Sequence, residues 1–207
     1  MLPIIFERKG EISFFLGNDT ISPQAVKLEY GQEKLDGTAV WKKSAGFECV
    51  KNSTFKFATV PRTQLKFEPG DYLFIAATIN GQRLNKVTWF PNGWKDIPWP
   101  TTKIWMQSLG QTQQGGEWLT TVKVSTERYA RLCHFIDLDA PEKLSTTQTP
   151  RVWFSDNYFD LPAGGERIVT IESNRKLDLS RIKAATWLDA RPNNPDGNPV
   201  STLHTNH

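Results

Sequence analysis

Residues 151–173 read RVWFSDNYFDLPAGGERIVTIES and contain the clearest structural signal in the chain. Aromatic and β-branched side chains occupy both arms of this stretch, with Val152, Phe154, Tyr158 and Phe159 in the first arm and Ile168, Val169 and Ile171 in the second. Between the arms, residues 162–165 are typical of a turn, because Gly164 and Gly165 can adopt any φ. Such arms around Pro and Gly predict a β-hairpin at the edge of a sandwich.

The same β pattern extends in both directions from this stretch. Residues 72–79 are almost entirely apolar, which favours a central strand, and residues 118–125 alternate between two faces. Extended runs are predicted at 11–17, 25–31, 38–42, 46–51, 53–59, 72–79, 83–90, 103–109, 118–125, 129–138, 152–154, 167–173 and 182–188, with 111–116 as a hairpin tip. No useful stretch has the helical period. The pattern predicts an all-β fold of antiparallel sandwiches.

The chain has 207 residues, enough for two domains of ordinary size. Residues 91–100, PNGWKDIPWP, contain three prolines, which favour a stiff linker between them. From residue 192 onwards the chain is rich in Pro, Asn and Gly and has little to bury. We predict one sandwich over residues 1–98, a second over 99–191, and a disordered tail over 192–207.

Charge and hydropathy argue against two classes of partner. The chain has 25 Lys and Arg against 22 Asp and Glu, a net charge of +3, which does not indicate a nucleic acid partner or an anionic membrane. No apolar run is long enough to span a bilayer. The first residues, MLPIIFERKG, lack the pattern of a signal peptide, so we expect any export signal to lie upstream.

The histidines and cysteines do not form a recognisable catalytic or metal-binding pattern. His134 alternates in phase with Leu132 and Ile136 and is predicted to be a buried core residue. Its neighbour Cys133 should point to the opposite face of the strand, which excludes a Cys–His dyad there. Cys49 and Cys133 lack the spacing of a metal site, and we expect no metal and no cofactor.

Two pairs of acidic residues are candidates for the paired carboxylates of a glycosidase, which lie about 5–5.5 Å apart in retaining enzymes. The pairs are Asp137 with Asp139, and Asp156 with Asp160. Each is better interpreted as an acid that caps a turn or a strand end. The series Asn194, Asp196 and Asn198 does not fit a calcium loop, because the glycine is misplaced and no bidentate Glu follows. We therefore expect no catalytic residue in this chain.

The aromatic residues Trp94 and Trp99 stand out because they lie in the proline-rich linker. We predict that they pack in a seam between the two sandwiches. The alternative is a platform on which a sugar ring stacks. Together with Tyr158, they are the residues on which a carbohydrate-binding or adhesion module would depend.

The sequence of residues 155–170 also resembles that of a known family. Ser155-Asp156-Asn157-Tyr158-Phe159-Asp160-Leu161-Pro162, followed by Glu166-Arg167-Ile168-Val169-Thr170, resembles the last immunoglobulin-like domain of glycoside hydrolase family 2, in the β-mannosidase branch. That family's pattern reads S-D-N-Y/F-F-D-L-L-P-G-E. This chain lacks one Leu before the Pro and has Ala163-Gly164-Gly165 in place of the tight turn, so we expect a different loop. Residues 118–139 are similar to the family's preceding strands.

The resemblance implies two immunoglobulin-like sandwiches and a longer parent enzyme. In that family two glutamates on a (β/α)8 barrel cleave terminal, non-reducing β-mannosides with retention, and no such barrel is encoded here. The chain would be the inactive C-terminal part of a β-mannosidase-like enzyme, with the missing barrel domain as its partner. Parent enzymes are periplasmic, secreted or lysosomal. The end domains of an exo-β-glucosaminidase, a carbohydrate-binding module that takes an oligosaccharide, and an independent enzyme remain open alternatives.

For the residues of the motif, the resemblance supports two roles. Asp156, Asn157 and Tyr158 would cap the hairpin and fill the base of the sandwich. The more specific hypothesis is that their loop lies near the barrel and helps to position the substrate or the loops of the barrel. Trp94 and Trp99 are the further candidates for such a position.

Overall fold

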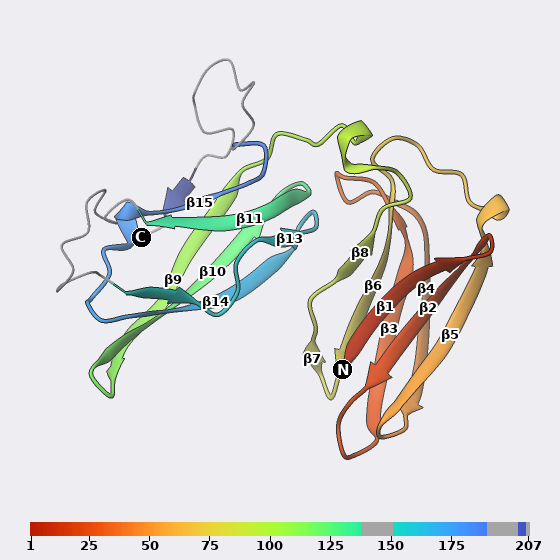
Figure 1. Cartoon of the computed structure of the whole chain (residues 1–207), viewed down its shortest axis with the longest axis horizontal. Coiled ribbons are helices and arrows are strands. Elements are labelled where there is room, and N and C mark those ends of the chain that lie inside the picture. Colours follow the sequence, from red (N-terminus) through yellow and green to blue (C-terminus); the bar gives the residue numbers. More distant parts are fainter. Residues whose placement is uncertain (138–150, 190–202, 206–207) are drawn as a thin grey trace. The chain divides into compact units, whose positions relative to one another are not determined.

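The computed structural model describes residues 1–137, 151–189 and 203–205 (Figure 1). The chain divides into two compact units, Met1–Pro98 and Trp99–His207. Each unit contains two sheets that face each other, and the described residues contain no α-helix. The prediction of an all-β fold with consecutive immunoglobulin-like sandwiches is confirmed.

The first unit consists of two antiparallel sheets. One has the order β1-β2-β5, and the other has the order β4-β3-β6-β7, with β8 also paired to β6. The strands are β1 (Leu2–Arg8), β2 (Glu11–Asn18), β3 (Gln24–Glu33), β4 (Ala39–Cys49), β5 (Ser53–Pro61), β6 (Tyr72–Ile79), β7 (Gln82–Arg83) and β8 (Val87–Trp89). Two short 3-10 helices, η1 (Arg62–Gln64) and η2 (Trp94–Asp96), complete it.

The core of the first unit follows from the alternation of its strands. Every second residue of β2 points inward and is fully buried, and these residues meet the inward faces of β3 and β6. The cluster contains Ile12, Phe14, Leu16, Val26, Leu28, Cys49, Leu73, Ile75 and Ala77. Strand β6 is buried on both faces over most of its length, as its apolar run predicts.

The second unit is built in the same way. Its larger sheet has the order β12-β14-β10-β9-β16, and its smaller sheet has the order β13-β11-β15. The strands are β9 (Ile104–Gln114), β10 (Glu117–Thr126), β11 (Ala130–Asp137), β12 (Val152–Phe154), β13 (Phe159–Leu161), β14 (Glu166–Ser173), β15 (Ile182–Ala185) and β16 (Leu203–Thr205), with a 3-10 helix η3 (Leu179–Arg181). All pairings are antiparallel except that of β16 with β9.

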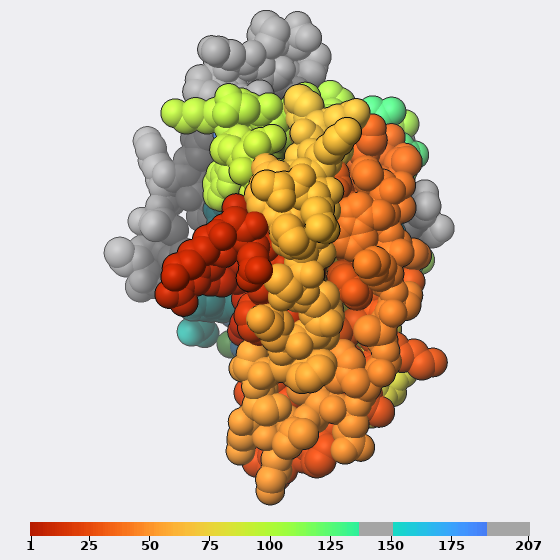
Figure 2. Space-filling model, turned by 90° about the vertical axis from the view of Figure 1, so that its right-hand side faces the viewer, coloured from red at the N-terminus to blue at the C-terminus, as the bar shows by residue number. Residues whose placement is uncertain are grey.

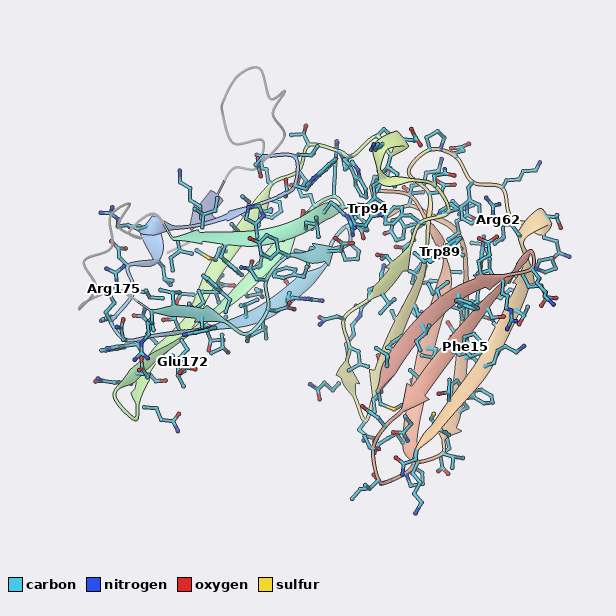
Figure 3. All side chains as sticks on the ribbon, in the orientation of Figure 1. Phe15, Arg62, Trp89, Trp94, Glu172 and Arg175 are labelled. Atoms are coloured by element: carbon cyan, nitrogen blue, oxygen red, sulfur yellow. The ribbon has the colours of Figure 1, made fainter. Side chains whose placement is uncertain are left out.

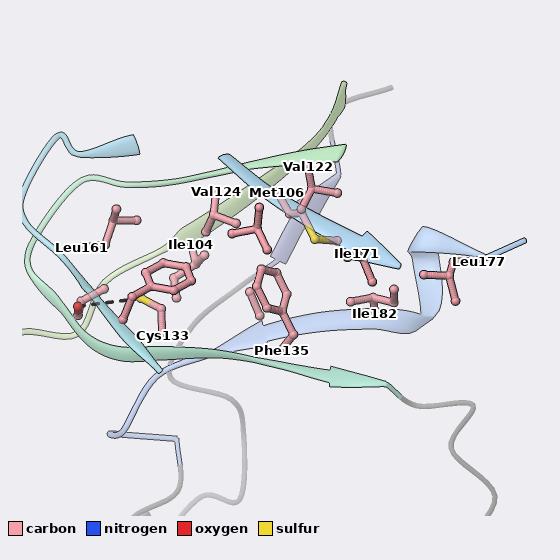
Figure 4. Packing of buried hydrophobic residues seen from close by; sticks show 14 residues of the cluster. Ile104, Met106, Val122, Val124, Cys133, Phe135, Leu161, Ile171, Leu177 and Ile182 are labelled. Carbon is pink, nitrogen blue, oxygen red and sulfur yellow. Dashed lines mark hydrogen bonds between the residues drawn. The ribbon is translucent and has the colours of Figure 1, made fainter. Parts of the chain in front are cut away.

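Inward residues from both sheets form the core of the second unit (Figure 4). Ile104, Met106, Val122 and Val124 come from the larger sheet, where Val122 and Val124 are fully buried as the alternation in 118–125 predicts. Cys133, Phe135 and Leu161 reach this core from the smaller sheet. The two apolar faces exclude water between them, which is the main source of stability in such a sandwich.

The stretch 151–173 departs from a simple hairpin. Strand β12 pairs with β14 as predicted, with Val152 opposite Ser173. Residues 159–161, however, form β13, which pairs with β11 in the opposite sheet. Between these strands Tyr158 has φ +59°, so the extended path ends there and the chain crosses the sandwich.

Some strand boundaries also differ from the prediction. Strand β1 was not predicted. The runs predicted at 38–42 and 46–51 are one strand, β4 (Ala39–Cys49), and residues 83–90 contain only part of β7 together with β8. The hairpin tip is confined to Gly115 and Gly116, which both have positive φ. Residues 203–205, which lie within the tail predicted to be disordered (192–207), form β16. The rest of that predicted tail lies outside the described residues.

Candidate functional site

The motif residues of the second unit surround a β-bulge in β11. Ala130 is opposite Leu161 and Cys133 is opposite Phe159, so β11 contains one residue more than β13 over this interval. The extra residue is accommodated at Leu132, whose φ is +47°. A bulky residue rarely adopts this conformation, because its Cβ crowds the following carbonyl oxygen. Other contacts must therefore stabilise the bulge.

Asp160 on β13 provides these contacts. Its carboxylate accepts hydrogen bonds from the Leu132 backbone amide (3.0 Å) and the Tyr129 hydroxyl (2.9 Å). It also forms an ion pair with the Arg131 guanidinium, and both side chains of this pair are largely buried. The carboxylate is therefore fully engaged in binding the bulge to the neighbouring strand.

The bulge reverses the predicted orientation of His134. Because one residue is added at Leu132, Cys133 and Phe135 point into the core, and His134 lies on the outer face. The prediction of a buried core histidine was wrong for this reason. The His134 ring instead stacks on Tyr158, with 5.3 Å between ring centroids and 15° between the ring planes.

Asn157 connects this outer face to the strand beneath it. Its Oδ1 accepts hydrogen bonds from the backbone amides of Phe135 and Tyr158, both at 3.1 Å. The first bond joins the loop before β13 to β11, and the second stabilises the left-handed conformation of Tyr158. The Tyr158 side chain is 64% exposed, so it caps the strands but does not fill the base of the sandwich.

Asp156 is bound to the other sheet. It forms an ion pair with Arg167 of β14, and the Arg167 guanidinium also lies over the Phe159 ring, 4.6 Å from its centroid. Asp156 and Asp160 are thus each paired with a different arginine. Sequence reasoning did not single out Arg131 or Arg167, although the motif places Arg167 directly after Glu166.

The two linker tryptophans belong to different units. Trp94 lies in η2 of the first unit and is 55% exposed (Figure 3). Trp99 belongs to the second unit, where its ring centroid lies 5.7 Å from that of Tyr129 and the Arg131 guanidinium lies 5.9 Å above it. Trp99 therefore packs on Tyr129 and Arg131, the two residues whose side chains contact Asp160 beside the bulge. Packing of both residues in a seam between the sandwiches stays a prediction.

Among the described residues, the remaining chemical candidates do not assemble into a site. Asp139 and the series Asn194, Asp196 and Asn198 lie outside the described residues. Cys49 and Cys133 are free and buried, and burial raises the pKa of the Cys133 thiol to about 12, so that it stays protonated. In the described part of the chain, no group of three His, Cys, Asp or Glu residues could bind a metal ion. No helix among these residues has the length and hydropathy to cross a membrane.

Two grooves lie on the outer face of the β4-β3-β6 sheet in the first unit. Their volumes are about 530 Å³ and 460 Å³, and both are lined by Lys27, Gly46 and Thr78. Neither groove is lined by any of the candidate residues from the sequence analysis, which are Trp94, Trp99, Asp156, Asn157 and Tyr158. The grooves are therefore independent of the motif in the second unit.

An apolar row occupies the outer face of the other sheet in this unit. Leu2, Ile4 and Phe6 of β1 point outward with exposed fractions of 60%, 36% and 52%, and Phe15 of β2 lies opposite Ile4. Figure 2 shows β1 in red at the surface, and Figure 3 labels Phe15 on β2. An outward row of large apolar side chains is unusual, because the outer face of a sandwich sheet is normally polar.

Comparisons with known proteins show what parts of the chain resemble. The Ig_mannosidase family model, an Ig-fold domain, matches residues 111–188. The comparison with curated proteins gave no match.

Solved structures resemble the whole chain. The β-D-mannosidase of Dictyoglomus thermophilum superposes with a TM-score of 0.72 at 14% identity, and the match covers 100% of this chain and 22% of that one. The exo-chitosanase of Amycolatopsis orientalis has a TM-score of 0.63 at 14% identity and covers 89% of this chain and 25% of that one. The same enzyme in complex with PNP-β-D-glucosamine gives a TM-score of 0.63 at 15% identity. The chain therefore spans about a quarter or less of the length of these structures.

Proposed function

From the match of residues 111–188 to the Ig_mannosidase family model, we propose that the chain is a non-catalytic accessory part of a β-mannosidase-like retaining exo-glycosidase. Such an enzyme of glycoside hydrolase family 2 would remove terminal, non-reducing β-mannose residues during carbohydrate catabolism. The catalytic domain would belong to a longer polypeptide and would be the partner of both sandwiches. Parent enzymes of this kind are expected in a periplasmic, secreted or lysosomal compartment.

The observation that carries this proposal is the family match combined with the engagement of the motif carboxylates. Asp156 and Asp160 are each bound to an arginine, and Asp160 accepts two further hydrogen bonds. A glycosidase needs one carboxylic acid whose pKa is raised and a second carboxylate that faces the same sugar. Here each of the two carboxylates is instead occupied by a guanidinium group of its own chain. The two acids therefore serve the fold.

The apolar row of β1 supports an accessory role. Leu2, Ile4 and Phe6 expose apolar area on an edge strand, where a free protein would risk association. A surface of this kind is expected where a domain of a longer protein packs against its neighbour. Trp94 and Trp99 would lie at such domain contacts.

Two alternatives follow from specific observations. The likeness to an exo-chitosanase solved with PNP-β-D-glucosamine supports a glucosaminidase as the parent enzyme. The exposure of Trp94 and Tyr158 supports a module that binds an oligosaccharide through stacked rings. Titration of the chain with mannan and chitosan fragments tests the second alternative directly.

The decisive experiment measures hydrolysis of para-nitrophenyl β-mannoside and β-glucosaminide by this chain and by the polypeptide that its gene encodes. We expect no turnover by the chain alone and β-mannoside turnover by a longer polypeptide. Turnover by the chain alone that is lost in Asp156→Asn or Asp160→Asn would overturn the proposal, provided that both variants remain folded. A preference for the glucosaminide would favour the alternative parent enzyme.

A further inference from the structure

The fold requires a positive φ at position 158, but it does not explain why a tyrosine, Tyr158, occupies this position. Its φ of +59° lies in the left-handed region, which Gly and Asn adopt far more readily than a bulky aromatic residue. Its side chain is nevertheless 64% exposed and contributes little to the core. A strained residue with an exposed side chain points to a function outside the fold of its own domain.

The surroundings of Tyr158 hold its ring in one position. Asn157 accepts a hydrogen bond from its backbone amide, and the ring of His134 stacks on one side. His134 is itself oriented by a contact of 3.0 Å between its Nδ1 and the carbonyl oxygen of Leu132. The aromatic pair is therefore preorganised, which reduces the side-chain conformational entropy that is lost when a partner binds.

The chemistry of this surface favours a protein partner over a sugar. Sugar hydroxyls donate to acceptors, but the Asp156 carboxylate is engaged by Arg167 and Oδ1 of Asn157 by two backbone amides. The outer surface at this place includes the Tyr158 ring, the edge of the half-buried His134 ring and the side chain of Ile136, which is 41% exposed. A rigid tyrosine beside an aliphatic side chain is typical of the centre of a protein–protein contact.

We propose that the surface formed by Tyr158, His134 and Ile136 docks on the catalytic domain of the longer polypeptide. This inference rests on the proposed function, and the solved relatives, of which the chain covers 22% and 25%, contain enough additional chain to supply that surface. Tyr158 acts as the anchor of the contact. The strain in its backbone is maintained because the ring is needed at this place.

The test compares oxidative labelling of Tyr158 in this chain and in the longer polypeptide. Trp153 is the internal reference, because it is an equally exposed aromatic residue of the same unit (69%) that lies on the other sheet. We expect at least fivefold less labelling of Tyr158 in the longer polypeptide, relative to Trp153. Equal labelling in both proteins would overturn the proposal. So would protection in the chain alone, whether it depends on concentration, on added mannobiose, or on neither.

A variant separates docking from folding. In this chain, Tyr158→Asn should leave the unfolding midpoint unchanged or raise it, because Asn tolerates a positive φ. In the longer polypeptide the same variant should lower the unfolding midpoint of the catalytic domain, whereas Trp153→Asn should not. A lower midpoint for Tyr158→Asn in the chain alone would show that the ring is structural and would refute the inference.

Activity of the same samples keeps the two proposals distinguishable. A longer polypeptide that hydrolyses the β-mannoside while Tyr158 stays fully labelled would refute docking and leave the proposed function intact. A longer polypeptide that protects Tyr158 but cleaves neither glycoside would support docking on its partner domain and refute the proposed glycosidase.

Discussion

The backbone amide of Leu132 donates a hydrogen bond of 3.0 Å to the carboxylate of Asp160, which lies on a different strand. Leu132 has φ +47° and accommodates the extra residue of the bulge in β11. Because of that residue, both Ala130 and Cys133 point into the core, although they are three positions apart. Asp160 therefore determines which face of β11 is buried, and with it the outward position of His134.

Asp160→Ala should strongly destabilise the second sandwich. The variant would leave the Arg131 guanidinium, whose side chain is 13% exposed, without its carboxylate, and the strained amide of Leu132 would lose its acceptor. We expect the free energy of unfolding to fall by about 3 kcal/mol. Hydrogen exchange of β10 and β14 amides in denaturant measures this. Glu172→Gln, at an exposed position of β14, should change the free energy of unfolding by less than about 0.5 kcal/mol. A similarly small effect of Asp160→Ala would contradict the role of Asp160 in stabilising the bulge.

Glu33→Ala should weaken the first sandwich by leaving a buried ammonium group unpaired. Glu33 accepts hydrogen bonds from the Tyr72 hydroxyl (2.8 Å) and from Lys86 Nζ (2.7 Å), and the side chains of Glu33 and Lys86 are 10% and 16% exposed. Loss of one partner from such a pair costs about 3–5 kcal/mol. Urea denaturation of the variant measures the loss.

The matched control for Glu33 is Glu68→Ala. Glu68 also contacts a lysine, Lys34, at 2.7 Å, but the two side chains are 71% and 42% exposed. Solvent and salt screen this pair, so its removal should have little effect on stability. Equal losses for the two variants would show that burial does not decide the contribution of these ion pairs.

Gly31→Ala should be much more damaging than Gly46→Ala. A Cβ at Gly31 would collide with the carbonyl oxygen of Trp41 and lie 3.0 Å from Lys42 Cα, and both atoms belong to the backbone of β4. The nearest atom to a Cβ at Gly46 is the carbonyl oxygen of Val26, at 3.8 Å. Thermal unfolding should show that Gly31→Ala lowers the free energy of unfolding by about 2–3 kcal/mol. Gly46→Ala should raise it by about 0.5 kcal/mol. A tolerated alanine at position 31 would disprove the close approach of β3 and β4.

Cys133 should make the stability of the second sandwich decrease at alkaline pH. Burial raises the pKa of its thiol to about 12 in the folded state, against about 8.5 in an unfolded chain. Above the unfolded value the unfolded state loses its proton and the folded state keeps it, so rising pH favours unfolding until about pH 12. From this residue we expect a decrease in the folding equilibrium constant of up to tenfold per pH unit above about pH 9.

The control for this pH dependence is Cys133→Ala, which removes the titrating group. Denaturation of both proteins between pH 7 and pH 10.5 should show a shallower decrease of stability for the variant above pH 9. Parallel curves for the two proteins would mean that the thiol has an ordinary pKa and that water reaches it in the folded state.

Local sequence patterns were sufficient for much of the fold. Residues 72–79 coincide with β6 and residues 152–154 with β12, because an apolar or alternating run has the same meaning wherever its partner strand lies. The motif at residues 155–160 also directed attention to Asp156, Asn157 and Tyr158, which are clustered with partners in the second unit. Their arginine partners were not predicted, because nothing near Asp160 in sequence indicates that Arg131 lies beside it.

The errors arose where a distant contact determines a local conformation. His134 was assigned to the core by uninterrupted alternation, whereas the bulge at Leu132 depends on Asp160, which is 28 positions away. Residues 159–161 were assigned to the hairpin, whereas they pair with β11 across the sandwich. Sequence alone determined that the chain forms short β-strands in antiparallel sandwiches, since side-chain alternation and turn residues are local properties. Only the tertiary structure decided which sheet each strand joins and which of its faces is buried, since hydrogen-bond register and bulges are selected by contacts between strands that are distant in sequence.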